Sequence, residues 1–137
     1  MTTYPGYPNR THYSPNFSRR ELDCRCGCRT PAHVQVNLVK LANTILEPLR
    51  VLNGGTLDIN CAYRCPKHNA TLPGAAKASK HLTGEGADVR SRLNTPVQLF
   101  ALGKTIPAVG GSKAYVGDGF CHVDGRPRVN GQITTWA

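Results

Sequence analysis

Apolar residues recur at helical spacing over one long stretch of the chain, residues 33–52. Positions three or four apart fall on one face of an α-helix, so the pattern predicts an amphipathic helix. The helix is expected to bend near Pro48, which lacks a backbone N–H, and to end at Asn53-Gly54-Gly55. Its apolar positions are Val34, Leu38, Leu41, Ala42, Ile45, Leu49 and Leu52. We expect this face to pack against a sheet.

Shorter segments predict strands and a second helix. Residues 56–60 alternate between apolar and polar side chains, which is typical of a half-buried strand. Residues 114–116 and 120–124 flank Gly117-Asp118-Gly119, a sequence that indicates a hairpin turn. Thr95 followed by Pro96 favours a helix start, and Gly103 favours its end. This mixture is compatible with an α+β fold but does not identify one.

The length of 137 residues fits one domain. Residues 1–16 hold three Pro and three Tyr but few aliphatic residues, which predicts an irregular arm beside a main domain of residues 17–137. Ser18 and Glu21 have the spacing of a capping box, so a short helical turn is expected after Phe17. The chain lacks both an apolar run of roughly 18 residues, the length of a membrane span, and an ordinary secretory signal at residues 1–8. We therefore expect a protein made in the cytoplasm and without a membrane span.

The formal net charge of +9 arises from 17 basic and 8 acidic side chains. Such an excess attracts polyanions over long range, whether nucleic acids or the anionic surface of a cell wall. The Lys and Arg are dispersed, whereas a nucleic-acid-binding protein usually shows a basic run with interleaved aromatics. Weak binding to an anionic surface, without nucleic acid, is therefore the expectation.

Three side chains form a candidate metal site: His81, Asp88 and His122. Three protein ligands and an open fourth position are typical of catalytic zinc. The six residues between His81 and Asp88 are too many for a helical pair, so we expect two extended segments joined by a turn at Gly84 and Gly86. The alternative is that these are scattered polar residues that look like a cluster only by accident.

His122 and Asp124 are two residues apart in a predicted strand. Residues i and i+2 of a strand project from the same face of a sheet. One of the two side chains is therefore expected to hold the metal while the other reaches the metal-bound water.

Three separated motifs resemble the M15-type zinc D,D-peptidases. Ser79, His81, Gly84 and Asp88 match the signature S-x-H-x-x-G-x-A-x-D, and His122-Val123-Asp124 resembles the element that closes the site in that family. Residues 63–69, Tyr-Arg-Cys-Pro-Lys-His-Asn, and the opening from Phe17 to Cys28 resemble the family's small single-domain branch. Two departures are Gly86, where the signature has Ala, and Asp124, where other members have a second His. We expect the Gly86 difference to affect only backbone freedom.

The resemblance implies the fold shared by D-Ala-D-Ala peptidases and the amino-terminal domain of hedgehog proteins. This is a single α+β domain with an antiparallel sheet of about four strands and helices packed on one face. A monomer is expected.

The resemblance also implies zinc-dependent hydrolysis of an amide bond in the stem peptide of peptidoglycan. Zn²⁺ would be held by His81, Asp88 and His122, and Asp124 would act as the general base. Asp118 is the reserve candidate for the base. The bond could be that of a D-Ala-D-Ala carboxypeptidase or of an L-Ala-D-Glu endopeptidase.

Arg64 is expected to bind a substrate carboxylate or the oxyanion, with Tyr63 and Ser79 lining the cleft. The resemblance implies a cell-wall lytic enzyme, either a phage endolysin, a virion-borne hydrolase or a bacterial autolysin with special export. Two alternatives remain: a hedgehog-like zinc-containing binding module without turnover, and a basic nucleic-acid-binding protein with a structural metal.

Six cysteines are present, three of them in the segment Cys24-Arg25-Cys26-Gly27-Cys28. The others, Cys61, Cys65 and Cys121, are near the proposed active-site segments, and six cysteines allow 15 pairings into three disulfides. Because the resemblance assigns zinc to His and Asp, we expect the cysteines to be buried packing or cross-links formed after release. A second metal site at residues 24–28 is the alternative.

Overall fold

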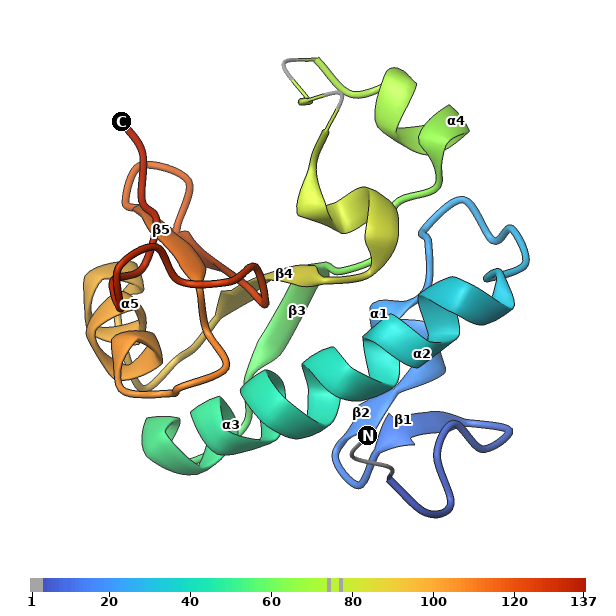
Figure 1. Ribbon diagram of the computed structural model, residues 1–137, viewed down its shortest axis with the longest axis horizontal. Coiled ribbons are helices and arrows are strands. Elements are labelled where there is room, and N and C mark those ends of the chain that lie inside the picture. The colour runs from blue at the N-terminus through green and yellow to red at the C-terminus, as the bar shows by residue number, and fades with distance from the viewer. Residues whose placement is uncertain (1–3, 74, 77) are drawn as a thin grey trace.

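The computed structural model of the chain describes residues 4–73, 75–76 and 78–137. A four-stranded antiparallel sheet in the order β3-β4-β6-β5 forms the centre, and β1 and β2 form a separate two-stranded sheet (Figure 1). The strands are β1 His12–Ser14, β2 Phe17–Ser18, β3 Asp58–Cys61, β4 Gly86–Arg90, β5 Gly111–Tyr115 and β6 Phe120–Asp124. The helices are α1 Arg19–Leu22, α2 Ala32–Leu41, the π-helix η1 Ala42–Leu46, α3 Glu47–Asn53, α4 Pro66–Ala70, the 3-10 helix η2 Lys80–Thr83 and α5 Pro96–Lys104.

The central pair of strands separates a buried face from a polar face. Ala87 pairs with Val123 and Val89 pairs with Cys121, and all four side chains are buried in the hydrophobic core. The alternate pair, Asp88 and His122, projects from the other face. The predicted α+β fold with a four-stranded antiparallel sheet is therefore confirmed, and the pairing of β4 with β6 brings distant polar residues together.

The predicted long helix forms as one continuous helical rod of α2, η1 and α3 (Figure 1). Its π-helical part ends at Leu46, two residues before Pro48, near which the sequence predicts a bend. Proline has no N–H to donate to the carbonyl one turn earlier, so a wider turn at this point satisfies the local backbone better than a regular α-helix would. The rod ends at Gly54, which has a positive φ of 84°. Its buried side chains include Val34, Leu38, Ile45 and Leu49.

The second predicted helix, α5, begins at Pro96 after a complete capping box between Thr95 and Gln98. It extends to Lys104, one residue beyond the predicted end at Gly103. The buried Gly103 faces β6, since a Cβ at this position would be 3.6 Å from Val123 Cγ1. No helix in the described part of the chain is both long and apolar enough to cross a membrane.

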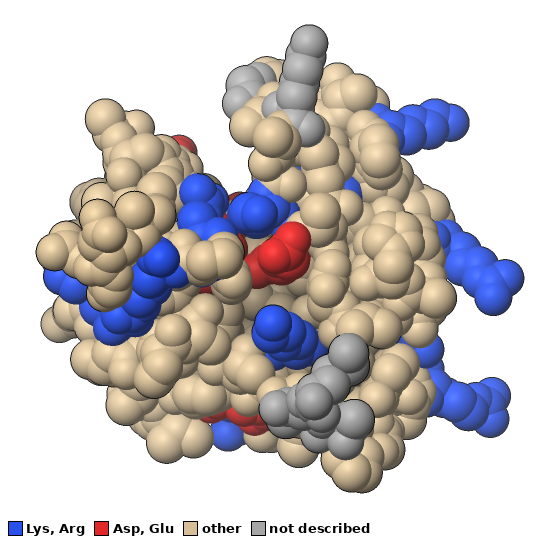
Figure 2. All heavy atoms as spheres, viewed as in Figure 1, with Lys and Arg blue, Asp and Glu red and all other residues tan. Residues whose placement is uncertain are grey.

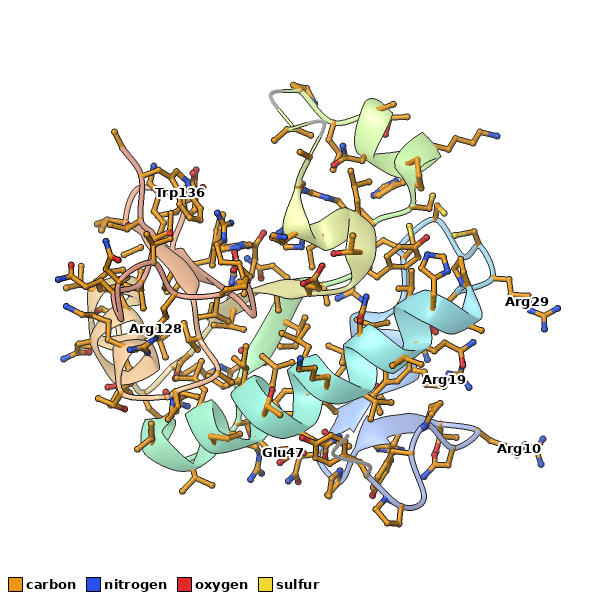
Figure 3. The ribbon with its side chains drawn as sticks, in the orientation of Figure 1. Arg10, Arg19, Arg29, Glu47, Arg128 and Trp136 are labelled. Atoms are coloured by element: carbon orange, nitrogen blue, oxygen red, sulfur yellow. The ribbon has the colours of Figure 1, made fainter. Side chains whose placement is uncertain are left out.

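The expectation of an irregular arm is wrong for the carboxyl end of that segment, because residues 12–14 form strand β1. Tyr13 and Ser14 are fully buried, and the exposed Asn16 is held by hydrogen bonds to Glu47. Ser14 Oγ donates to Glu47 Oε2 at 2.6 Å, and the Asn16 side chain donates to Glu47 Oε1 at 2.7 Å. Glu47 extends from α3 toward this segment (Figure 3). Residues 1–3 of the predicted arm lie outside the described residues.

The segment after Gly125 returns to the sheet. Thr134 N donates to Gly110 O at 2.8 Å, and Ser112 N donates to Thr134 O at 3.0 Å. Trp136 Nε1 then donates to the Tyr115 hydroxyl at 3.0 Å. Figure 3 shows Trp136 near the carboxyl end, beside β5. The last residues therefore build part of the molecule's functional face.

Glu47→Ala should lower the free energy of unfolding by roughly 1–3 kcal/mol, because the buried Ser14 hydroxyl would lose its acceptor. Urea unfolding followed by circular dichroism measures the change. Asp58→Ala removes an exposed carboxylate and is the matched control. Equal stability of the two variants would show that Glu47 does not anchor the amino-terminal segment.

Candidate metal centre and substrate cleft

His81, Asp88 and His122 meet on the polar face of the sheet. His81 Nε2 is 3.2 Å from Asp88 Oδ1, and His122 Nδ1 is 3.0 Å from the same oxygen. One ligand atom from each residue lies within 4.8 Å of the other two. Two imidazole nitrogens and a carboxylate oxygen are a donor set that suits zinc, and all three residues line a cleft.

His81 is positioned by a 3-10 turn, so the expectation of two extended segments is wrong for its side of the site. Ser79 Oγ accepts from His81 N at 3.2 Å and begins η2, and Gly84 ends it with a positive φ of 76°. Within the ring, Nδ1 is 2.7 Å from Ala62 O. This contact fixes the ring proton on Nδ1. The lone pair of Nε2, which points toward Asp88, is therefore available to bind a metal.

His122 is held between two carboxylates. Its Nδ1 faces Asp88, while its Nε2 is 2.7 Å from Asp124 Oδ2. Asp124 also accepts two hydrogen bonds from the Arg126 side chain, at 2.8 and 2.7 Å. A histidine that binds metal through one nitrogen commonly donates through the other to a carboxylate, which sets its tautomer and orientation.

The geometry does not fit Asp124 as the general base. Its side chain is fully buried, and both oxygens are already hydrogen-bonded to His122 or Arg126. It does not line the cleft, so it has no direct path to a metal-bound water. Asp118, the reserve candidate, is exposed in the β5–β6 turn and is also absent from the cleft lining. Asp124 is instead hydrogen-bonded to His122 Nε2 and to the Arg126 side chain.

Gly86 matters for space and not for backbone freedom, which corrects the expectation for this position. Its φ is not positive. A Cβ there would be 3.0 Å from His122 Cε1 and 3.3 Å from Asp124 Cβ. Gly111 is even more constrained, since its Cβ would be 2.5 Å from Asp124 Oδ1. The two glycines therefore make room for the His122–Asp124 pair.

The pKa shifts follow from these contacts. Burial by itself would lower the pKa of His81, but hydrogen bonds to Asp88 and Cys61 outweigh it and raise the pKa to about 9. Burial would likewise lower the pKa of His122, but hydrogen bonds to Asp124 and Asp88 outweigh it and raise the pKa. Burial would raise the pKa of Asp88, but the two histidines hold it well below its usual range. Metal binding must therefore displace protons from the imidazoles.

A cleft opens above these three residues, between the 64–81 segment and the carboxyl-terminal segment. Figure 2 shows the surface hollowed between these two parts of the molecule. Three cationic side chains line it, Arg64, Lys80 and Arg126. Its other lining includes Ser79, Tyr115, Phe120 and Trp136. The chemistry of the wall suits a ligand that carries carboxylates.

Arg64 is the predicted substrate-binding residue with the clearest support. Its Nη2 donates to Ser79 Oγ at 3.1 Å, and its Nε is buried with no hydrogen-bond partner among the described residues. An arginine that lines a cleft is suited to an anionic ligand. Tyr63, in contrast, is packed in the hydrophobic core and does not line the cleft.

Arg126 and Trp136 were not identified from the sequence as site residues. Arg126 lies 5.0 Å over the Trp136 ring, and the Trp136 ring is 5.5 Å from that of His122. Both side chains belong to the segment after Gly125. No spacing pattern links them to the histidines, so only the folded chain reveals them.

Asp124→Asn should weaken zinc binding by about 10- to 100-fold, because the amide orients His122 less well and leaves Arg126 without its carboxylate. A competition titration with a chromophoric chelator measures the affinity. If Asp124 were the base, the variant would bind zinc normally and only the rate of catalysis would fall.

Chelated protein should lose thermal stability as the pH rises from about 6.5 to above 9. Because His81 has a folded pKa raised from 6.5 to about 9, its stabilising contribution is complete below 6.5 and disappears as pH rises through 9. Asp88, whose pKa is lowered on folding, contributes stability above pH 3.8, and this contribution is lost as the pH falls. Calorimetry in chelator tests this, and Asp88→Asn should flatten the alkaline decline while Asp58→Asn should not.

Comparison with known proteins places this site in a family. No curated protein sequence matches the chain. The sequence model described as Peptidase M15 matches residues 15–124, a range that contains His81, Asp88, His122 and Arg64 but ends before Arg126. M15 peptidases are metallopeptidases that are generally zinc-dependent, and the match covers well over half of the chain. The chain therefore belongs to the peptidase M15 family.

Proposed function

We propose that this chain is a zinc-dependent peptidase that hydrolyses an amide bond in the stem peptide of peptidoglycan. The observation that supports this most directly is a two-histidine, one-aspartate site that faces a cleft lined by Arg64, Lys80 and Arg126. Zinc at such a site would polarise a scissile carbonyl and make bound water acidic near neutral pH.

The protein's own residues would hold and orient the metal. His81 would bind through Nε2, because its Nδ1 faces Ala62 O. His122 would bind through Nδ1, because its Nε2 faces Asp124. Asp88 lies between the two rings and contributes the oxygen. The buried Asp124–Arg126 pair keeps the His122 ring from rotating.

Arg64 would bind a carboxylate of the substrate. Ser79 accepts from Nη2 and so holds the guanidinium at the wall of the cleft. Stem peptides carry several free carboxylates, and Lys80 and Arg126 offer further cations in the same cleft. The cleft thus matches the substrate class in charge, whereas the choice between D-Ala-D-Ala and L-Ala-D-Glu bonds depends on the uncharged lining.

The positive charge outside the cleft supports action at an anionic wall. Lys and Arg are spread over the face in Figure 2 with few Asp or Glu among them, in line with the net charge of +9. Dispersed cations favour weak attachment to a polyanionic surface. The proposal therefore includes work on the cell wall as a lytic enzyme of the endolysin or autolysin type, by a monomer.

Digestion of purified peptidoglycan followed by mass spectrometry of the muropeptides tests the proposal. Zinc-loaded protein should release a new amine and carboxyl at one stem-peptide bond, and His81→Ala should abolish this. Arg64→Lys should lower kcat/KM by about 10- to 100-fold, the usual effect of losing a charge-assisted hydrogen bond. Arg29→Lys is the matched control, because Arg29 is exposed and lies just before the amino end of α2, away from the carboxyl-terminal segment (Figure 3).

Two results would contradict the proposal. Zinc binding without cleavage of wall or soluble muropeptide would favour a hedgehog-like binding module. Salt-sensitive binding to nucleic acid, with no binding to wall, would favour a basic nucleic-acid-binding protein with a structural metal.

A further inference from the structure

Four cysteines from two distant parts of the chain meet at one point. Cys24, Cys26 and Cys28 come from the loop after α1, and Cys65 comes from the segment between β3 and α4. Their four sulfurs all lie within 4.8 Å of one another. We refer to these four residues as the cysteine cluster. Cys61 and Cys121 are not part of it.

We propose that the cysteine cluster binds a second zinc ion, with a structural role, separate from the His81–Asp88–His122 site. A tetrahedral Zn²⁺ site with Zn–S bonds of about 2.3 Å requires sulfurs about 3.8 Å apart. Cys24 Sγ is 3.3 Å from Cys26 Sγ, and Cys26 Sγ is 3.6 Å from Cys65 Sγ. Small side-chain rotations would bring the sulfurs into that geometry.

Disulfide pairing explains this arrangement less well. A disulfide joins two sulfurs at about 2.05 Å and separates them from any others. Here all six cysteines lie in the described part of the chain and are free thiols, and four of them surround a common centre. Buried packing does not explain it either, since Cys26 and Cys28 are exposed. Buried packing is therefore wrong for Cys26 and Cys28, whereas cross-links formed after release stay a prediction.

The backbone around the cysteine cluster is arranged to support sulfur ligands. Cys65 N donates to Cys24 Sγ at 3.4 Å, and His68 N donates to Cys65 Sγ at 3.3 Å. Such N–H donors stabilise thiolates and orient them toward a metal. Gly27 has a φ of +82°, which allows the tight turn that places Cys26 and Cys28 together. Because Cys26 and Cys28 are exposed, an ion can enter from solvent.

Binding requires no oxidant or reductant. Each thiol would lose its proton to solvent as its sulfur bonds to Zn²⁺, so four thiolates and one divalent ion form the closed site typical of structural zinc. A closed set of four sulfurs leaves no position for water or substrate. The cluster would therefore stabilise the fold and not catalyse a reaction.

The cluster would stabilise the segment that supports the catalytic site. Cys65 directly follows Arg64, and Arg64 N donates to His81 O at 3.0 Å. Ala62, three residues before Cys65, orients His81 through its carbonyl. On the other side, Tyr63 N donates to Leu22 O at 2.9 Å. A metal at the cluster would thus fix residues 62–65 against the amino-terminal loop.

Cobalt substitution of the full chain tests the proposal independently of the first site. The reduced, metal-free His81→Ala protein, in which the first site is disrupted, is titrated with Co²⁺, and thiolate-to-cobalt charge-transfer absorption should saturate at one equivalent. Zinc-loaded protein should contain two Zn²⁺ per chain. Cys28→Ser, an exposed position, should lose the absorption and one Zn²⁺, whereas Arg29→Ala, an exposed residue next to Cys28 and outside the cluster, should keep both. His81→Ala should keep the absorption and lose the other Zn²⁺.

Three results would overturn the second zinc site. The first is one Zn²⁺ per chain that disappears in His81→Ala, with no thiolate band in the cobalt protein. The second is a thiolate band that persists in both Cys28→Ser and Cys26→Ser. The third is fewer than six free thiols in protein purified without reductant and then unfolded in chelator, which would show disulfides. Failure of peptidoglycan cleavage alone would leave the cysteine result unaffected, so the two proposals fail separately.

Discussion

The pairing of β4 with β6 is the constraint on which the site depends. In this register Asp88 lies directly opposite His122, and Ala87 lies opposite Val123. Because side chains alternate between the faces of a sheet, burying Ala87 and Val123 forces Asp88 and His122 onto the other face together. A slip of one residue would exchange the two faces. The hydrophobic core therefore fixes the distance between two of the three metal ligands.

The third ligand and the orienting groups depend on close backbone approach. Ser79 and Gly84 begin and end the 3-10 turn that carries His81 to the same face. Gly86 and Gly111 leave space in which a Cβ would press on His122 and Asp124, respectively. With this space, Asp124 can be fully buried and still pair with Arg126. Burial of an ion pair is costly unless its hydrogen bonds are complete, and here both carboxylate oxygens are satisfied.

Local patterns were sufficient to predict the elements but not all of their partners. The α2–α3 rod, α5 and the β5–β6 hairpin follow from periodicity, capping residues and turn residues, which act over a few positions. The motif around His81 and Asp88 predicted the candidate ligands, and the fold brings them together. The role of Asp124 could not be predicted, because it depends on Arg126 and on burial. Trp136 also reaches the cleft through tertiary contacts that leave no local pattern.

The two groups of metal-binding side chains are connected through one short segment. Residues 62–65 contact His81 through Ala62 and Arg64, and the same segment contributes Cys65 to the cysteine cluster. The loop of residues 24–28 has only one buried cysteine and exposes the other two, so apolar packing does little to hold it. A catalytic site needs ligands held to within a fraction of an ångström, and loops alone seldom provide this. A closed metal site that includes Cys65 would hold residues 62–65 more rigidly than apolar packing of the loop alone.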